Sequence, residues 1–198
     1  MTISRKQVSN NYNPNTNDNP EELLIEVTED DEVIGQVTRK ECHNETRRPW
    51  HRSIHIFLFN LKGDLYLSQR GKKKDTAPGE WTVSAAGHVN LGESYEEAAK
   101  IELEEELGLN IGLKLIDKFA IDYGSEREVV AIFAGVTEKE PTIKEEEVEQ
   151  IKVFNFESIV KKFKNKQFDL SGGSRDSFLH VIKSGSLKMF REKYVLLT

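Results

Sequence analysis

Apolar residues gather in short blocks along most of the chain after residue 20, separated by turn residues. Blocks rich in β-branched and aromatic residues predict strands. They fall at residues 22–28, 33–39, 53–60, 65–69, 81–86, 113–122, 126–136 and 150–156. Asp30-Asp31 marks a turn between the first two blocks, and Lys62-Gly63-Asp64 makes the next two a hairpin. The segment at residues 42–51 shows neither pattern, so we expect it to be irregular.

A different periodicity, that of an amphipathic helix, begins after Ser94. Ser94 and Glu97 form a Ser-x-x-Glu capping box, and Gly108 can close the other end in a left-handed turn. An apolar strip on this helix is expected to face the core, and it consists of Ala99, Leu103 and Leu107. Further helices are expected at residues 158–166 and 175–182, followed by an apolar C-terminal tail.

Residues 1–20 are polar and rich in Asn, with no periodic apolar pattern. We predict a flexible N-terminal arm there, whose removal up to residue 18 leaves folding and activity largely unchanged. Residues 21–198 contain no internal repeat, and a chain of 198 residues suits one domain with a single core. The order of strands and few helices predicts an α/β layered sandwich.

Composition narrows the class of protein. No apolar run approaches the ~20 residues of a membrane span, and the N-terminus lacks a signal-peptide core. The single cysteine, Cys42, excludes an intrachain disulfide and fits a reducing compartment. A net charge of −6 argues against a surface that coats nucleic acid. We therefore expect a cytoplasmic protein with neither a membrane nor a nucleic-acid partner.

Three glutamates lie beside the apolar strip of the predicted helix without a basic neighbour: Glu102, Glu105 and Glu106. The outward-facing Glu104, by contrast, has Lys100 four residues away. Most charge runs are solvated helix faces, but such faces usually include lysines. Clustered carboxylates without a basic partner favour a hard divalent cation, Mg²⁺ or Mn²⁺.

These glutamates belong to a stretch that resembles the Nudix box, G-x5-E-x7-R-E-U-x-E-E-x-G-U, in which U is a bulky aliphatic residue. The matching positions are Gly87, Glu93, Glu102, Leu103, Glu105, Glu106, Gly108 and Leu109. The box arginine is replaced by Ile101. The resemblance implies a Nudix-type α/β/α sandwich with a mixed β-sheet, spanning residues 21–198. It also implies a pyrophosphohydrolase that cleaves a diphosphate linkage in a small molecule.

The same resemblance assigns roles around the box. The box glutamates and the Gly87 carbonyl would hold Mg²⁺ or Mn²⁺, while Glu93 and Gly108 would maintain the structure of the box. Arg70 and Lys74, in the basic run before Pro78-Gly79, match positions that grip phosphate.

The resemblance leaves the water-activating base open between Glu105, Glu128 and residues 145–147. It also leaves open how Ile101 affects the site, because the family arginine pairs with the carboxylate that matches Glu93.

Outside the box, residues 22–181 resemble the branch of the superfamily that includes isopentenyl-diphosphate isomerase. Those isomerases use a thiol before the Gly-His pair, where this chain has Ala86, and a carboxylate that matches Glu128, with Glu126 on the same strand face. They hold a divalent ion with histidines, for which the candidates here are His88, His43 and His51.

Alanine cannot transfer a proton, and all three inner glutamates are present. We therefore favour hydrolysis over the isomerase reaction. A catalytically weak, ligand-binding Nudix domain is the remaining alternative. The substrate and the choice between a monomer and a homodimer stay open.

Overall fold

The computed structural model describes residues 16–44 and 46–195, so the predicted arm lies mostly outside the described residues. The strands are β1 (Leu23–Val27), β2 (Val33–Thr38), β3 (Trp50–Asn60), β4 (Leu65–Arg70), β5 (Trp81–Thr82), β6 (Ala85–His88), β7 (Leu113–Asp122), β8 (Arg127–Thr137) and β9 (Val148–Phe154). The helices are α1 (Arg39–Cys42), α2 (Tyr95–Leu107), α3 (Phe156–Lys164), α4 (Gly172–Ser184) and α5 (Ser186–Tyr194).

The strands form one mixed sheet, as expected. Strand β3 runs through its middle and pairs in parallel with β8 along its whole length. Its other neighbours, β1, β4 and β6, are antiparallel to it. The sheet continues through β8 to β7 on one side and through β4 to β9 on the other. Strands β3, β6 and β8 thus lie side by side where polar residues interrupt their apolar pattern.

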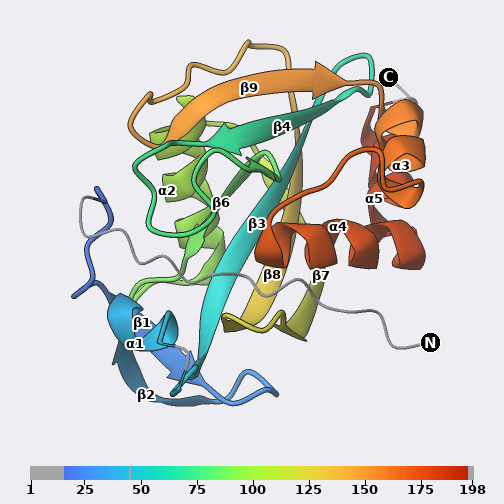
Figure 1. Ribbon diagram of the computed structural model, residues 1–198. Coiled ribbons are helices and arrows are strands. Elements are labelled where there is room, and N and C mark those ends of the chain that lie inside the picture. Colours follow the sequence, from blue (N-terminus) through green and yellow to red (C-terminus); the bar gives the residue numbers. More distant parts are fainter. Residues whose placement is uncertain (1–15, 45, 196–198) are drawn as a thin grey trace.

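Helices cover both faces of the sheet (Figure 1), with α2 on one face and α3, α4 and α5 on the other. On the α2 face, Ile56 belongs to the same core as Leu103 and Leu107. On the opposite face, the rings of Phe57 and Phe178 stack 5.9 Å apart. The α/β/α sandwich predicted from the sequence is therefore confirmed. No helix in the described residues is long and apolar enough to cross a membrane.

The structure differs from the predicted elements in three places. Residues 81–86 divide into β5 and β6, because Val83 and Ser84 leave the strand pairing between them. Residues 42–51 are not wholly irregular, because they contain the end of α1 and the beginning of β3. The predicted C-terminal tail contains α5, which starts after Gly185 without a side-chain cap and buries Leu187 and Phe190.

Candidate active site

A cavity of about 800 Å³ opens beside β6. Its wall combines the glutamates of α2, the loop between β4 and β5, the start of α4, and the ends of β3 and β8. Most of the residues singled out from the sequence line this one cavity: Arg70, Lys74, Gly87, His88, Glu102, Glu105, Glu106 and Glu128. Segments far apart in the sequence therefore contribute to one site.

Helix α2 carries the three glutamates that line the cavity, and both of its ends are fixed by local contacts. Ser94 and Glu97 form the predicted capping box, and Gly108 ends the helix at φ 62°, in the left-handed region. The apolar strip of α2 is buried as predicted, and Glu106 beside it is only 9% exposed. Glu102 lies against Gly87, where an added Cβ would approach its Oε1 to 2.1 Å. A side chain at position 87 would therefore displace the Glu102 carboxylate from the place that it occupies here.

Burial and mutual repulsion make Glu102 and Glu106 reluctant to ionise. Burial raises the pKa of Glu106 to about 7, although nearby Lys74 and Arg70 oppose the shift. Burial and the charge of Glu106 raise the pKa of Glu102 well above its usual value. Glu105 also lines the cavity but is exposed. A divalent cation would remove the repulsion between these carboxylates, so the donor set fits Mg²⁺ or Mn²⁺.

Two positions of the box, Ile101 and Glu93, lack the ion pair that an arginine would make between them. Ile101, which replaces the arginine, is 41% exposed and lies outside the cavity lining. The carboxylate of Glu93 instead accepts a hydrogen bond from the backbone N–H of Asn90, at 3.0 Å. The loop before α2 is therefore closed by a local contact that needs no arginine.

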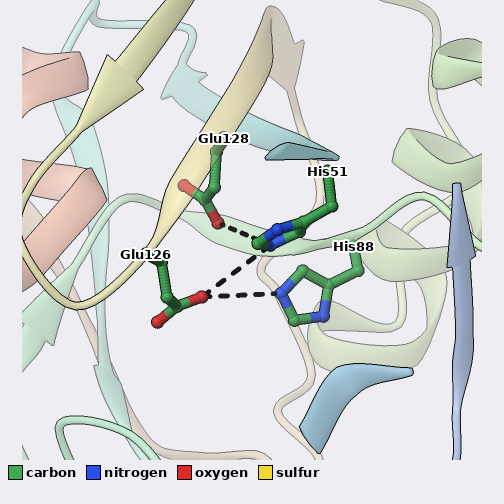
Figure 2. Close-up of side chains that lie close together, drawn as sticks. All are labelled: His51, His88, Glu126 and Glu128. Atoms are coloured by element: carbon green, nitrogen blue, oxygen red, sulfur yellow. Dashed lines mark ion pairs between the residues drawn. The ribbon is translucent and has the colours of Figure 1, made fainter. Parts of the chain in front are cut away.

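A second group of donors lies on the other side of β6, and Figure 2 shows its members pointing toward one another. One ligand atom from each of His51, His88, Glu126 and Glu128 lies within 4.8 Å of all the others. Strand pairing explains this convergence, because His51 is the register partner of Glu128 and His88 is that of Ser53. Among the described residues, the three α2 glutamates form no group that converges as closely.

The hydrogen bonds of the histidines set which nitrogen can bind a cation. His51 lies with Nδ1 3.2 Å from the carbonyl oxygen of Pro49, so Nδ1 donates and Nε2 keeps its lone pair. Burial lowers the pKa of His51 to about 4, which keeps the ring neutral. Arg39, always a donor, lies 3.2 Å from Nδ1 of His88, so the proton of neutral His88 is on Nε2. His51 is therefore better prepared as a ligand than His88.

His43 differs from both, because it lies between two carboxylates. Its Nδ1 is 3.2 Å from Asp75, and its Nε2 is 3.1 Å from Glu126. Despite burial, Glu126 and Asp75 raise the pKa of His43 to about 9. Despite its own burial, Glu126 has a lowered pKa because His43 and the other histidines face it. His43 thus serves as a charged partner of Glu126 and is not part of the converging group.

Two buried polar atoms of this second group have no hydrogen-bond partner in the described part of the chain, Nε2 of His51 and Oε2 of Glu128. Burial and the neighbouring Glu126 raise the pKa of Glu128 to about 8. Orphaned donor atoms of imidazole and carboxylate type fit a divalent cation. The residues present therefore fit a metal on both sides of β6.

The cavity also contains the two predicted phosphate-binding residues, but both have protein partners. Arg70 donates from Nε to the carbonyl oxygen of Thr76, at 2.9 Å. Lys74 binds the carboxylates of Asp18 and Glu147. Asp18 belongs to the predicted N-terminal arm, yet its carboxylate is buried and also lies 3.4 Å from Arg39. Residues 16–20 are thus in contact with the domain, and truncation to residue 18 removes a buried ion pair.

We expect the substitution Asp18→Asn to lower the melting temperature by several degrees. Lys74 and Arg39 would lose a charged partner in a partly buried site, at a cost of roughly 1–3 kcal/mol. In a domain of this size, 1 kcal/mol corresponds to about 2–4 °C. The control is Asp30→Asn in the exposed turn before β2. Equal melting temperatures for the two variants in a thermal unfolding experiment would show that Asp18 contributes nothing to the domain.

Sequence reasoning missed the residues that orient the histidines. Asp75 accepts two hydrogen bonds from Arg39, at 2.9 and 3.0 Å, and lies against Nδ1 of His43. Arg39 is the first residue of α1, which the sequence pattern did not predict. An isolated arginine and an aspartate 36 positions apart carry no spacing signal, so only the fold reveals this pair.

Comparisons with known proteins identify the family of this chain. Residues 49–171 match the family model described as a NUDIX domain. The chain is 36% identical over 140 residues to an isopentenyl-diphosphate Δ-isomerase 2 of Photorhabdus laumondii, covering 68% of this chain and 78% of that protein. It is 34% identical over 130 residues to an uncharacterized Nudix hydrolase of Pseudomonas aeruginosa, covering 65% of this chain and 76% of that protein. A crystal structure from Deinococcus radiodurans superposes with a TM-score of 0.64 at 25% identity, covering 77% of this chain and 93% of that one.

Proposed function

Because the chain belongs to the Nudix family, we propose that it is a metal-dependent hydrolase that cleaves a diphosphate linkage in a small molecule. The observation that carries the proposal is the neighbouring pair of half-buried Glu102 and buried Glu106, which lines a cavity that also holds Arg70 and Lys74. Carboxylates for a cation and basic groups for phosphate meet there in one place.

The residues have distinct roles in this proposal. Glu102, Glu105 and Glu106 would hold Mg²⁺ or Mn²⁺, with the Gly87 carbonyl as a further oxygen. Bound there, the cation supplies charge neutralisation on the phosphate oxygens and a lower pKa for water. Arg70 and Lys74 bind and orient the phosphate groups. The glycine at position 87 keeps Glu102 within reach, as the close approach of its side chain indicates.

The reaction itself needs one water and one base. The water oxygen attacks a phosphorus atom of the diphosphate, the bridging P–O bond breaks, and the bridging oxygen leaves with the other phosphate. A carboxylate takes the proton of the attacking water. Among the candidates, Glu105 is the exposed glutamate in the cavity, Glu128 is buried with a raised pKa, and Glu147 is bound to Lys74. Glu105 is therefore the base that we propose.

A screen of small diphosphates with phosphate release as the readout tests this proposal. We expect release that depends on Mg²⁺ or Mn²⁺ and stops when a chelator is added. An intact, metal-loaded protein that releases no phosphate from any diphosphate would favour a ligand-binding role instead.

The isomerase reaction is the second candidate, because the group around His51 and Glu128 resembles the isomerase metal site and some relatives carry that name. It needs a proton donor opposite the carboxylate. The residue in that place is Ala86, which lines the cavity. The thiol of Cys42 lies outside the cavity lining, in a separate apolar cluster with Leu24 and Val37. Burial raises the pKa of that thiol, so it remains protonated and inert.

We therefore expect no dimethylallyl diphosphate above background when the protein is incubated with isopentenyl diphosphate and Mg²⁺. Loss of a catalytic acid or base commonly costs about 10²–10⁴-fold in rate. The matched variant Ala86→Cys restores a thiol opposite Glu128 and is expected to give a trace of the isomer. Ready isomer formation by the unmodified protein would overturn the preference for hydrolysis.

A further inference from the structure

Residues 16–19, which we call the N-terminal segment, enter the cavity beside its basic loop. Asn17, Asp18 and Asn19 belong to the cavity lining. The backbone N–H of Asn17 donates to the carbonyl oxygen of Lys73, at 3.2 Å, which attaches the segment to the loop between β4 and β5. The side chain of Asp18 is only 6% exposed. A stretch that carries no apolar residue therefore buries a carboxylate in the wall of the site.

The Asp18 carboxylate lies where several donors converge. Its Oδ1 contacts the ammonium of Lys74 and lies 3.4 Å from Nη2 of Arg39. Its Oδ2 accepts hydrogen bonds from the backbone N–H of Asp75, at 2.8 Å, and from the hydroxyl of Thr16, at 3.0 Å. An ammonium, a guanidinium and a loop N–H directed at one anion are the donors that proteins use for phosphate. The loop that carries Lys74 thus binds a carboxylate of its own chain as it would bind a phosphate oxygen.

Lys74 cannot bind Asp18 and a substrate phosphate equally well at the same time. Its ammonium already contacts Asp18 and, at 2.9 Å, the carboxylate of Glu147. The Lys74 side chain is 13% exposed, which leaves little surface for a further anion. Anions held at one ammonium also repel each other. A diphosphate that binds Lys74 therefore competes with these carboxylates.

Of the two carboxylates, Asp18 is the one on a segment that can move away. Residues 16–19 are all polar, so burial of apolar surface does not hold them in place. The chain is anchored again at Pro20, whose carbonyl oxygen accepts a hydrogen bond from α1, at 3.0 Å. Glu147, by contrast, is fixed through its own carbonyl oxygen, which accepts from the backbone N–H of Gly71 at 2.9 Å. The N-terminal segment can thus swing out at Pro20 without disturbing β1.

We propose that Asp18 is a built-in competitor of the substrate phosphate, which binds Lys74 in the empty protein and is displaced with the N-terminal segment when a diphosphate binds. This inference rests on the proposed function, because that function assigns Lys74 to the phosphate. Only the molecules whose segment is open can bind the ligand, so the apparent affinity falls by the open fraction. The contact that we expect to stabilise the empty protein therefore weakens its binding of diphosphates.

Calorimetry with methylenediphosphonate and Mg²⁺ tests the competition. This probe has the two phosphorus centres of a diphosphate but no bridging oxygen, so it binds without being hydrolysed. We expect Asp18→Asn to bind it about tenfold more tightly than the unmodified protein, which corresponds to a closed segment in about nine molecules of ten. A carboxylate that only positions Lys74 would give the opposite sign. Weaker or unchanged binding by Asp18→Asn, or no binding by either protein, would overturn the inference.

The matched control is Glu22→Gln. The carboxylate of Glu22 lines the same cavity and accepts a hydrogen bond from Arg39, at 3.1 Å. A gain in affinity that comes only from removing one negative charge should appear in this variant as well. We expect the gain in Asp18→Asn to be several times larger, because that substitution also releases the N-terminal segment. Equal gains in the two variants would contradict displacement.

Hydrogen exchange of the unmodified protein measures the displacement directly and needs no variant. Residues 16–19 should exchange faster when methylenediphosphonate and Mg²⁺ are added, because the N–H of Asn17 loses its bond to Lys73. The loop at residues 71–77 should exchange more slowly, because it binds the probe. Slower exchange at residues 16–19 would indicate a segment that closes over the ligand and would overturn the inference. Both measurements record binding alone, so failure to hydrolyse any diphosphate would count against the proposed function and not against the competition.

Discussion

Replacing Glu106 with glutamine is expected to lower kcat for diphosphate hydrolysis by at least about 10²-fold, as removal of one group that stabilises developing charge commonly does. The side chain is buried in the cavity wall beside Glu102, and glutamine has the same shape without the negative charge. Because the amide binds a hard cation far more weakly, the metal site loses a ligand. The fold should remain intact, as circular dichroism and thermal unfolding can verify.

The matched control for this experiment is Glu104→Gln on the same helix. Glu104 is exposed and lies outside the cavity lining. Its substitution should leave kcat within about twofold, because a single solvated charge on a helix surface contributes only tenths of a kcal/mol. Near-full activity in Glu106→Gln would mean that Glu102, Glu105 and Glu106 lie on a solvated face of α2 with no part in catalysis.

The Glu106→Gln substitution is also expected to stabilise the metal-free protein at alkaline pH. Burial raises the pKa of Glu106 from its usual 4.5 to about 7. At pH values below the pKa of Glu106 in the unfolded chain, the carboxyl group is protonated in both the folded and the unfolded state. It then has no effect on the free energy of unfolding. As pH rises from 4.5 to about 7, the unfolded chain ionises while the folded protein retains the proton, so the free energy of unfolding falls.

Glutamine cannot ionise and avoids this loss, which is on the order of 3 kcal/mol for a shift of this size. In metal-free buffer at about pH 8 we therefore expect Glu106→Gln to melt several degrees above the unmodified protein, and the gap to close near pH 4.5. Added Mg²⁺ should reverse the order, because it stabilises the protein that retains the carboxylate. A difference in melting temperature that does not depend on pH would contradict the assignment of a buried Glu106 carboxyl group with a raised pKa.

Much of the fold followed from local patterns. The capping box at Ser94, the glycine end at Gly108 and the apolar strip of α2 were all predicted and are present. The strand at residues 113–122 matches β7 to the residue. Such features depend on neighbours close in sequence, so a single chain reveals them. The helix α5 escaped prediction because nothing but Gly185 marks its start.

The candidate site was predictable only where a motif has fixed spacing. The box glutamates, Arg70 and Lys74 lie in one cavity, and His88, His51 and Glu126 do converge. What the sequence could not show is the network of Asp18, Arg39 and Asp75, since it depends on three segments brought together by the sheet.

Hydrolysis in water enriched in oxygen-18, with Mg²⁺ and the small diphosphate that the phosphate-release screen identifies as a substrate, tests the central claim most directly. Mass spectrometry of the products shows whether water has attacked phosphorus. The account predicts that one product phosphate carries a single heavy oxygen, and that its formation stops with a chelator and in Glu106→Gln. Turnover without heavy oxygen in either phosphate product, or labelled product at an undiminished rate in Glu106→Gln, would contradict it.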